Sequence, residues 1–187
     1  MRLKKVNFSN PLEKYVYHVW GKMLQRCYCD EYMIKTHRTS YLDCSVCDEW
    51  HNFTNFRGWY LTNYYEINCN ENLCLDKDIL FPKNNIYAPD RCILVPNTIN
   101  SFFVKMGYPR ISHPSKNRFQ LFVSKHNHCT YEGSFETFNE AENKYWEVKK
   151  QRLLDLCEEY KDCLPSNIYE LLINLDLTQY KKGVNNE

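Results

Sequence analysis

The triplet Asp76-Lys77-Asp78, with the asparagines that follow it, carries the residue types in this sequence that are best suited to chemistry. Two carboxylates flank one amine, and Asn85 and Asn100 supply amide oxygens downstream. Carboxylate and amide oxygens are hard ligands of the kind that Mg²⁺ accepts while it keeps several waters. Asp and Asn are also the ordinary residues of turns. The pattern therefore admits either a divalent-metal site or a structural turn.

The segment around this triplet is typical of a strand, a long loop, a second strand and a helix. Apolar residues bracket the triplet and predict a short buried strand that ends in a turn; they are Leu73, Leu75, Ile79 and Leu80. The loop 81–90 ends in Ala88-Pro89-Asp90, which stops a helix, and 92–95 is a second apolar run of strand character. Pro96 begins a predicted helix toward Phe103. This is the layout of a ββα-metal unit, in which a bent hairpin holds one divalent ion and one base.

Four short motifs follow one another in residues 75–100. They are Leu75-Asp76-Lys77-Asp78-Ile79, Asn85-Ile86-Tyr87-Ala88-Pro89, Asp90-Arg91-Cys92, and Asn97 or Asn100. Upstream lie Trp20, Met23, Arg26-Cys27-Tyr28 and Val46-Cys47-Asp48-Glu49-Trp50, with Phe53 and Phe56. In this order, over roughly the first hundred residues, the motifs resemble those of the HNH (His-Me finger) nucleases of phages. The resemblance implies a metal-dependent DNA endonuclease, with Asp76, Lys77, Asp78 and Asn85 as the catalytic motif and Asp76 and Asn100 as ligands of Mg²⁺ or Mn²⁺.

Lys77 stands where active members of that family carry the histidine that deprotonates the attacking water. An ammonium with an ordinary pKa of about 10.4 is a poor base at neutral pH, and adjacent carboxylates push its pKa upward. We therefore expect Lys77 to form a structural ion pair with Asp76 or Asp78, and cleavage to be weak or absent. A working nickase stays open as an alternative, with a water, Asp78 or a distant histidine such as His18 or His51 in place of the base.

Ten cysteines without an export signal indicate free thiols or metal ligands rather than disulfides. The spacing Cys44-Ser45-Val46-Cys47 is that of a zinc knuckle, and Cys27-Tyr28-Cys29 is a conceivable second pair. Buried cysteine is also an ordinary small hydrophobic residue, so we expect no structural zinc. We expect neither a signal peptide nor a membrane span, and we predict a cytoplasmic protein, in a bacterial host cell if it is phage-encoded.

Three short strands and a long helix are predicted beyond Gly107 and Pro109. The strands cover 108–112, 118–124 and 128–135, and the helix begins near Thr137. On the middle strand Phe119, Leu121 and Val123 point to one face, and Arg118, Gln120, Phe122 and Ser124 point to the other. The helix carries an apolar stripe that can cover the first of these faces: Phe138, Ala141, Tyr145, Val148 and Leu153.

Two motifs of this second region match a known DNA-binding domain. They are Phe119-Gln120-Leu121-Phe122-Val123 and Tyr131-Glu132-Gly133-Ser134-Phe135-Glu136-Thr137-Phe138-Asn139-Glu140-Ala141. They resemble the three-stranded sheet and helix of the plant ethylene-response (apetala-type) factors, a domain that phage HNH proteins often carry. The usual Trp of the middle strand is replaced by Phe119 or Phe122. The resemblance implies that the exposed sheet face enters the major groove of double-stranded DNA, with Arg110, Arg118 and Gln120 near bases or phosphates.

Charge is segregated in the same region, although the formal net charge of the chain is only +1. Residues 91–131 contain no Asp or Glu, whereas they contain six cations: Arg91, Lys105, Arg110, Lys116, Arg118 and Lys125. Such a patch is the electrostatic signature of nucleic-acid binding, and we predict contacts from Arg110, Lys116, Arg118, Gln120 and Lys125. The alternative is that the acids of the following helix balance these charges; they are Glu136, Glu140, Glu142 and Glu147.

Together these patterns predict an α+β fold in which N-terminal helices and a degenerate HNH-like ββα unit precede a three-stranded antiparallel sheet packed on a long helix. The predicted domains are 1–105, 106–163 and a C-terminal segment, 164–187, with a short helix capped by Ser166 or Asn167. The favoured function is that of a phage-type DNA-binding protein. An active endonuclease and an interaction protein that inhibits a host or defence enzyme are the alternatives.

Overall fold

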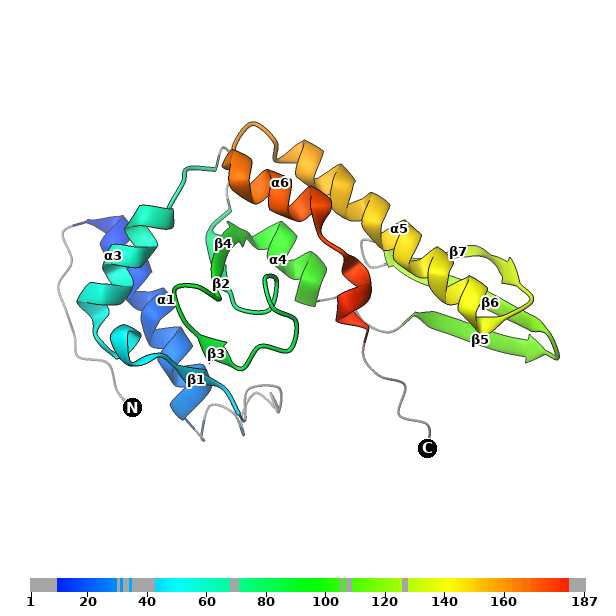
Figure 1. The fold of residues 1–187 in the computed structure, drawn as a ribbon, viewed down its shortest axis with the longest axis horizontal. Coiled ribbons are helices and arrows are strands. Elements are labelled where there is room, and N and C mark those ends of the chain that lie inside the picture. The colour runs from blue at the N-terminus through cyan, green and yellow to red at the C-terminus, as the bar shows by residue number, and fades with distance from the viewer. Residues whose placement is uncertain are drawn as a thin grey trace. The chain divides into compact units, whose positions relative to one another are not determined.

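The computed structural model describes residues 10–29, 31, 34, 43–67, 71–104, 106, 109–125 and 128–181. The fold is of the α+β class, and the chain divides into two compact units, Met1–Asn100 and Ser101–Glu187 (Figure 1). The first unit contains α1 (Pro11–Tyr28), β1 (Ser45–Val46), the 3-10 helix η2 (Asp48–His51), α3 (Phe53–Asn63), β2 (Leu73–Asp76), β3 (Ile86–Tyr87), β4 (Ile93–Pro96) and the start of α4 (Asn97–Val104). The second contains β5 (Arg110–Ser115), β6 (Arg118–Lys125), β7 (His128–Phe135), α5 (Phe138–Glu159), α6 (Ser166–Asn174) and the 3-10 helix η3 (Leu177–Tyr180). Across these described residues, no helix is long and apolar enough to cross a membrane.

Helix α1 begins where the sequence predicts. The side chain of Asn10 accepts a hydrogen bond from the backbone N–H of Leu12 at 2.9 Å, and Pro11 occupies the first turn, where no N–H is needed. The buried face of the helix recurs at helical spacing: Val16, Trp20, Met23, Leu24 and Cys27. The cap expected from Asn10 before Pro11 is confirmed, and the apolar face expected from the sequence is buried except for Tyr15 and Val19, which are half-buried.

Asp48 before an aromatic run predicts one helix that begins there, and the structure differs from this expectation. The chain forms the short helix η2, breaks at Asn52 and continues as α3. Asn52 is the true cap of α3, because its side chain accepts from the backbone N–H of Thr54 at 2.9 Å. An Asx cap four residues downstream therefore replaces the expected one, and the break redirects the aromatic residues that follow.

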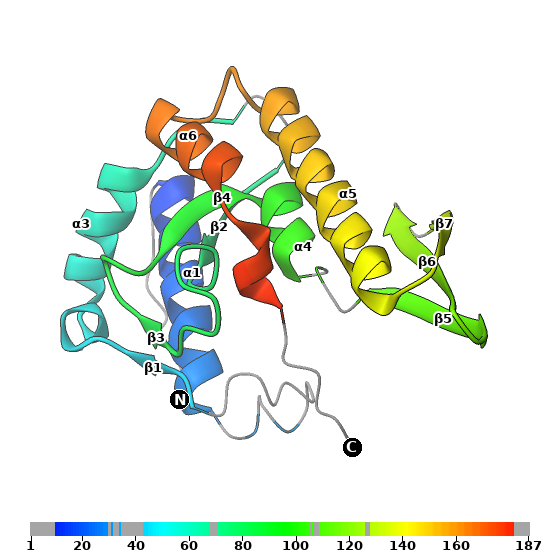
Figure 2. The same ribbon diagram turned by 45° about the vertical axis from the view of Figure 1, so that its right-hand side comes forward.

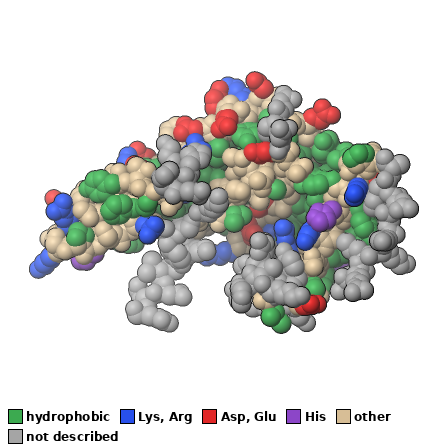
Figure 3. Space-filling model, turned by 180° about the vertical axis from the view of Figure 1, so that it is seen from behind, with side chains coloured by type: hydrophobic (Ala, Val, Ile, Leu, Met, Phe, Trp, Pro, Cys, Tyr) green, Lys and Arg blue, Asp and Glu red, His purple; other side chains and the backbone are tan. Residues whose placement is uncertain are grey.

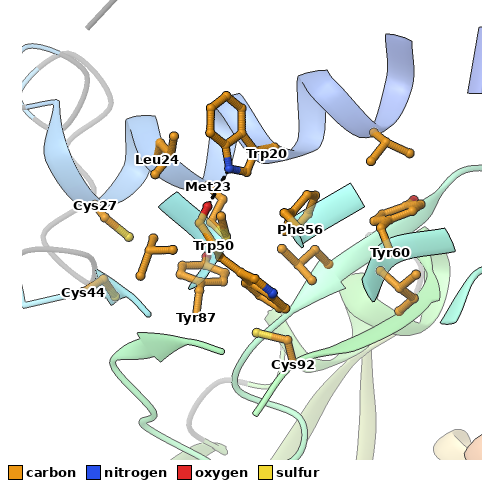
Figure 4. Close-up of a cluster of buried hydrophobic side chains, with 14 of the residues drawn as sticks. Trp20, Met23, Leu24, Cys27, Cys44, Trp50, Phe56, Tyr60, Tyr87 and Cys92 are labelled. Carbon is orange, nitrogen blue, oxygen red and sulfur yellow. Dashed lines mark hydrogen bonds between the residues drawn. The ribbon is translucent and has the colours of Figure 1, made fainter. Parts of the chain in front are cut away.

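These aromatic residues form the core of the first unit, as the sequence predicts. Trp50, Phe56 and Tyr60 are buried, and in Figure 4 they face the side chains of α1. The indole N–H of Trp20 donates to the backbone oxygen of Trp50 at 2.7 Å, so the polar atom of this large side chain is satisfied inside the core (Figure 4). The core packs α1, η2 and α3 against one another and against β2 and β4, the two strands of the hairpin that carries the triplet.

Strands β2 and β4 pair antiparallel, from Leu73 opposite Pro96 to Asp76 opposite Ile93, and α4 follows directly. This is the predicted order of strand, loop, strand and helix. Pro96 is the last residue of β4 rather than the first of the helix, which is a one-residue correction. The long loop contributes β3, which pairs parallel with β1 through Ser45–Ile86 and Val46–Tyr87. The loop is thereby anchored to the segment that precedes η2.

In the second unit β5, β6 and β7 form an antiparallel sheet in that order, and α5 lies across one face (Figure 2). Leu121 and Val123 are buried on that face, which confirms the predicted alternation of β6. Thr137 and Glu140 form a reciprocal capping box at the start of α5. The first strand begins at Arg110, and Tyr108 lies outside the described residues.

Two predictions about the helices of this unit need correction. In α5 the expected stripe is only partly buried: Phe138 is exposed although its ring contacts that of Phe119, Val148 is half-buried, and Lys149 is buried as well. Helix α6 has Pro165 at its cap position and no side-chain cap, so Ser166 lies inside the helix rather than before it. No side-chain cap forms there because the side chain of Pro165 has no hydrogen-bond acceptor.

Candidate functional site

Asp76, at the end of β2, shapes the turn that follows. One of its carboxylate oxygens, Oδ1, accepts the backbone N–H of Asp78 at 2.7 Å and that of Ile79 at 2.8 Å. Burial raises the pKa of Asp76, and the two backbone N–H donors oppose that rise. One of its two oxygens is therefore committed to the protein backbone.

Lys77 is held inside the protein, with only 5% of its surface exposed. Its ammonium donates to both carboxylate oxygens of Asp78, at 2.8 and 3.0 Å, and to the backbone oxygen of Asn84. The thiol of Cys44 is a further hydrogen-bonding neighbour, and the ring centroid of Tyr87 lies 6.0 Å away. The predicted ion pair is thus made with Asp78, and an amine held in this way has little freedom to turn toward a substrate.

Asn84, which the sequence reasoning missed, completes this arrangement. Its buried side chain donates to the backbone oxygens of Lys77 at 2.9 Å and Ile86 at 2.7 Å, and accepts from the N–H of Ile86 at 3.1 Å. The side chain of Asn85, the residue predicted from the sequence, is exposed; its backbone oxygen accepts from Ser45. The two asparagines are adjacent and follow a left-handed residue, Lys83 (φ 64°), and Asn84 is the one whose side chain points inward.

Asn100, the second predicted metal ligand, lies on α4. Its Oδ1 is buried and has no hydrogen-bond partner within the described part of the chain. Its amide contacts the thiol of Cys74, which is two residues before Asp76 on β2 and so shares its strand face. Asp76 and Asn100 are both neighbours of Cys74, and among the described residues no three His, Cys, Asp or Glu side chains are grouped to hold a metal ion. Two oxygen donors alone would hold Mg²⁺ weakly, because the ion would keep most of its hydration shell.

The N-terminus of α4 is already occupied by a carboxylate. Glu71 accepts the backbone N–H of Thr98 at 3.1 Å and also binds the hydroxyl of Thr98. Free N–H groups at a helix N-terminus attract anions such as phosphate. Glu71 supplies that negative charge from within the chain.

Cys27, Cys92 and His51 are engaged in packing or local hydrogen bonds. Burial raises the pKa of Cys27 and of Cys92 to about 12 each, as expected of thiols packed in an apolar core. The Nε2 atom of His51 lies 3.3 Å from the hydroxyl of Tyr28 and 3.2 Å from the backbone oxygen of Val46. His18, on α1, is exposed.

The outer face of the sheet in the second unit, opposite to α5, has a different character. Strand register places Arg110 opposite Phe122 and Ser112 opposite Gln120 on this face. Lys116 lies at the tip of the β5–β6 turn, where Asn117 adopts a left-handed conformation (φ 59°), and Arg118 begins β6. We call these residues, with Tyr131 of β7, the outer sheet face.

Arg110, Lys116 and Arg118 are exposed, and across the described residues none of the three forms an ion pair with a carboxylate. The guanidinium of Arg110 reaches only the sulfur of Cys129, at 3.8 Å. Glu132 is the one acid in the sequences of the three strands. The side chain of Lys125, the remaining predicted contact, lies outside the described part of the structure.

The acids of α5 do not balance these cations, because most are engaged elsewhere. Glu147 pairs with Lys144 at 2.8 Å and Glu142 with Lys181 at 3.0 Å, while Glu140 accepts the N–H groups of Glu136 and Thr137. On the face drawn in Figure 3, most Asp and Glu side chains lie along the upper edge, and the sheet shows hydrophobic side chains with Lys and Arg and a few acids at its borders. Arg110, Lys116 and Arg118 of the outer sheet face therefore keep their charges without a carboxylate partner among the described residues.

The two regions thus differ in what they leave free for a ligand: the triplet has bonded its charges internally, and the outer sheet face has not. Comparisons of the chain with protein-family models, with curated proteins and with solved structures gave no match.

Proposed function

We propose that this chain is a DNA-binding protein of phage type, built on a degenerate HNH-like scaffold with weak or absent cleavage. Double-stranded DNA is the ligand, and the outer sheet face is the surface that contacts it. The observation that carries the proposal is the set of exposed cations on that face, Arg110, Lys116 and Arg118, without carboxylate partners among the described residues. The bacterial cytoplasm is the compartment in which such a protein would meet its DNA.

The physical basis is the release of counterions from the phosphate backbone. Each phosphate neutralised by a cation adds about 0.9 to the slope of log affinity against log salt concentration. Three cations therefore give a slope of about 3, which makes binding strong at low salt and weak at high salt. Arg110 and Arg118 suit this role, because a guanidinium offers two parallel donors to one phosphate.

The triplet supports the second half of the proposal, that cleavage is weak or absent. Lys77 is paired with Asp78 and bonded to the backbone of Asn84, so it has no lone pair with which to accept a proton from water. One carboxylate oxygen of Asp76 accepts a backbone N–H of the turn, and the carboxylate of Glu71 occupies the N-terminus of α4. The hairpin has the order of strand, loop, strand and helix that the HNH-like scaffold implies. Its polar groups bond to one another and to the backbone, and so stabilise the fold.

Fluorescence anisotropy with a labelled duplex at several salt concentrations tests the binding surface. We expect Arg118→Ala and Lys116→Ala each to weaken binding and to lower the salt slope by about one. Lys144→Ala is the matched control, since Lys144 lies on α5, half-buried, and is already paired with Glu147. Equal affinity of all three variants and the wild type would contradict the assignment of the outer sheet face.

A supercoiled-plasmid assay with Mg²⁺ and Mn²⁺ tests the absence of cleavage. We expect retardation of the plasmid without conversion to the nicked form. Nicking by the wild type that disappears in Asp76→Ala would replace this proposal with the active endonuclease. A preparation that neither retards nor nicks DNA would remove DNA binding altogether.

A further inference from the structure

Two aromatic side chains lie together on the outer sheet face. Phe122 of β6 and Tyr131 of β7 are register partners, and their ring centroids are 5.5 Å apart. The ring of Tyr131 is held in place by a 2.9 Å hydrogen bond between its hydroxyl and that of Ser134, yet 51% of the residue is exposed. A surface that needed only to bind phosphate would gain nothing from such a pair, because aromatic rings carry no positive charge.

Gln120 precedes Phe122 by two residues and therefore shares the same face of β6. The hydroxyl of Ser112 donates to its Oε1 at 3.4 Å. The Nε2 group has no protein partner within the described residues, so it is free to donate outward. Gln120 and Phe122 thus follow Arg118 on the same face of β6, with Arg110 opposite Phe122 on β5 and Tyr131 opposite it on β7.

We propose that the outer sheet face prefers A·T base pairs, which Phe122 and Tyr131 recognise through thymine methyl groups and Gln120 through adenine. This inference rests on the DNA-binding function proposed above and names the base pairs that the same surface reads. In the major groove an A·T pair presents the N7 acceptor and N6 donor of adenine beside the C5 methyl group of thymine. Glutamine matches the first pattern with its two amide groups, and an apolar ring matches the methyl group.

The spacing along β6 agrees with this assignment. Two residues of a strand span about 6.7 Å, and two base-pair steps span about 6.8 Å. With β6 along the groove, Gln120 and Phe122 address positions two base pairs apart. Duplex DNA is favoured over a single strand, because the major groove holds the adenine edge and the thymine methyl group in one plane between two rows of phosphates. On this face Gln120 and Phe122 lie side by side on β6, with one arginine before them and Arg110 on the neighbouring strand.

The test uses the full chain and four labelled probes of equal length: an A·T duplex, a G·C duplex, the A·T duplex with deoxyuridine in place of thymidine, and one of its single strands. Deoxyuridine removes only the methyl group and keeps base pairing and charge. We expect the A·T duplex to bind more tightly than the G·C duplex. Deoxyuridine should weaken binding roughly fourfold for each thymine methyl group that an aromatic ring covers.

The variants locate the effect. Tyr131→Ser and Phe122→Ser should each reduce the difference between thymidine and deoxyuridine probes while the salt slope stays unchanged. Tyr131→Ser keeps the test valid if Phe122→Ser fails to fold, since Tyr131 is the more exposed of the two. Phe81→Ser, at an exposed aromatic residue of the first unit, is the matched control and should keep the full difference.

The outcomes separate this inference from the proposed function. Equal binding to thymidine and deoxyuridine duplexes would overturn the inference and leave DNA binding intact. Tighter binding of the single strand than of its duplex would overturn it in favour of stacking on unpaired bases. Failure to bind any of the four probes would overturn the proposed function itself.

Discussion

Lys77 in the first unit and Arg118 in the second both lie at the end of a strand, beside residues suited to chemistry, but their surroundings are opposite. Lys77 is buried and donates to a carboxylate and a backbone oxygen, whereas Arg118 is exposed without a carboxylate partner among the described residues. The sequence alone would allow either cation to bind phosphate. The comparison teaches that the hydrogen-bonding capacity left over after folding decides which of them serves binding.

The contrast between Lys77 and Arg118 is tested most directly by removing the buried cation, Lys77. Lys77→Met leaves the backbone oxygen of Asn84 without its donor and Asp78 without its partner, so we expect a loss of about 3 kcal/mol in the free energy of unfolding. Urea titration followed by tryptophan fluorescence measures it, since Trp20, Trp50 and Trp59 lie in the first unit. Lys83→Met, at an exposed lysine of the same loop, is the control, and similar losses for both would contradict the structural role of Lys77.

The adjacent asparagines offer a sharper contrast within the first unit. Asn84→Ala removes three hydrogen bonds from a buried site, and we expect a loss of about 2 kcal/mol. Asn85→Ala changes an exposed side chain and should cost less than about 0.5 kcal/mol. The same urea titration distinguishes the two variants. A greater loss of stability in Asn85→Ala would show that Asn85, and not Asn84, holds the loop in place.

A smaller effect is expected from the charge of Asp76. Because burial raises its pKa in the folded protein, the stabilisation from this group is fully present below its unfolded pKa, near 4, and is lost as the pH rises through the raised value. Asp76→Asn keeps an acceptor for the N–H groups of Asp78 and Ile79 but cannot titrate. The stability of this variant relative to wild type should therefore rise between pH 4 and pH 7. Unfolding curves across that range test it, and a relative decline with rising pH would contradict the sign.

The smallest change in stability is expected on the outer sheet face. The double variant Arg110→Ala, Arg118→Ala should alter the free energy of unfolding by less than about 0.5 kcal/mol, because neither side chain pairs with a carboxylate in the described structure. Thermal unfolding by circular dichroism measures this, and DNA affinity should fall in the same sample. A loss comparable to that of Lys77→Met would mean that these cations also serve the fold.

Local signals in the sequence predict much of this fold. Asn10 before Pro11, the alternation of Phe119, Leu121 and Val123, and Thr137 before Glu140 each specify a cap or a face through residues only a few positions apart. The ion pair of Lys77 and Asp78 is predictable for the same reason.

Other features depend on distant contacts or on choices between equivalent neighbours. Nothing local indicates that Ser45 pairs with Ile86, or that Asn84 rather than Asn85 turns inward. Lys149 is unexpected in the core because a cation is costly to bury. Its ammonium lies 5.4 Å from the ring centroid of Tyr145 and 5.7 Å from that of Phe102, and burial lowers its pKa, a setting that only the tertiary structure reveals.

The bonds around Lys77 and Asn84 also tie together parts of the chain that are not neighbours in sequence: the end of β2, the loop before β3, and through Cys44 the segment before β1. Such a cross-link restricts local opening, since the loop cannot move away without breaking several bonds at once. Slow amide hydrogen exchange should therefore extend to Ile86 and Ser45, beside a loop that contains little regular secondary structure. The triplet that the sequence offers as a catalytic motif then lies at one of the most slowly fluctuating points of the first unit.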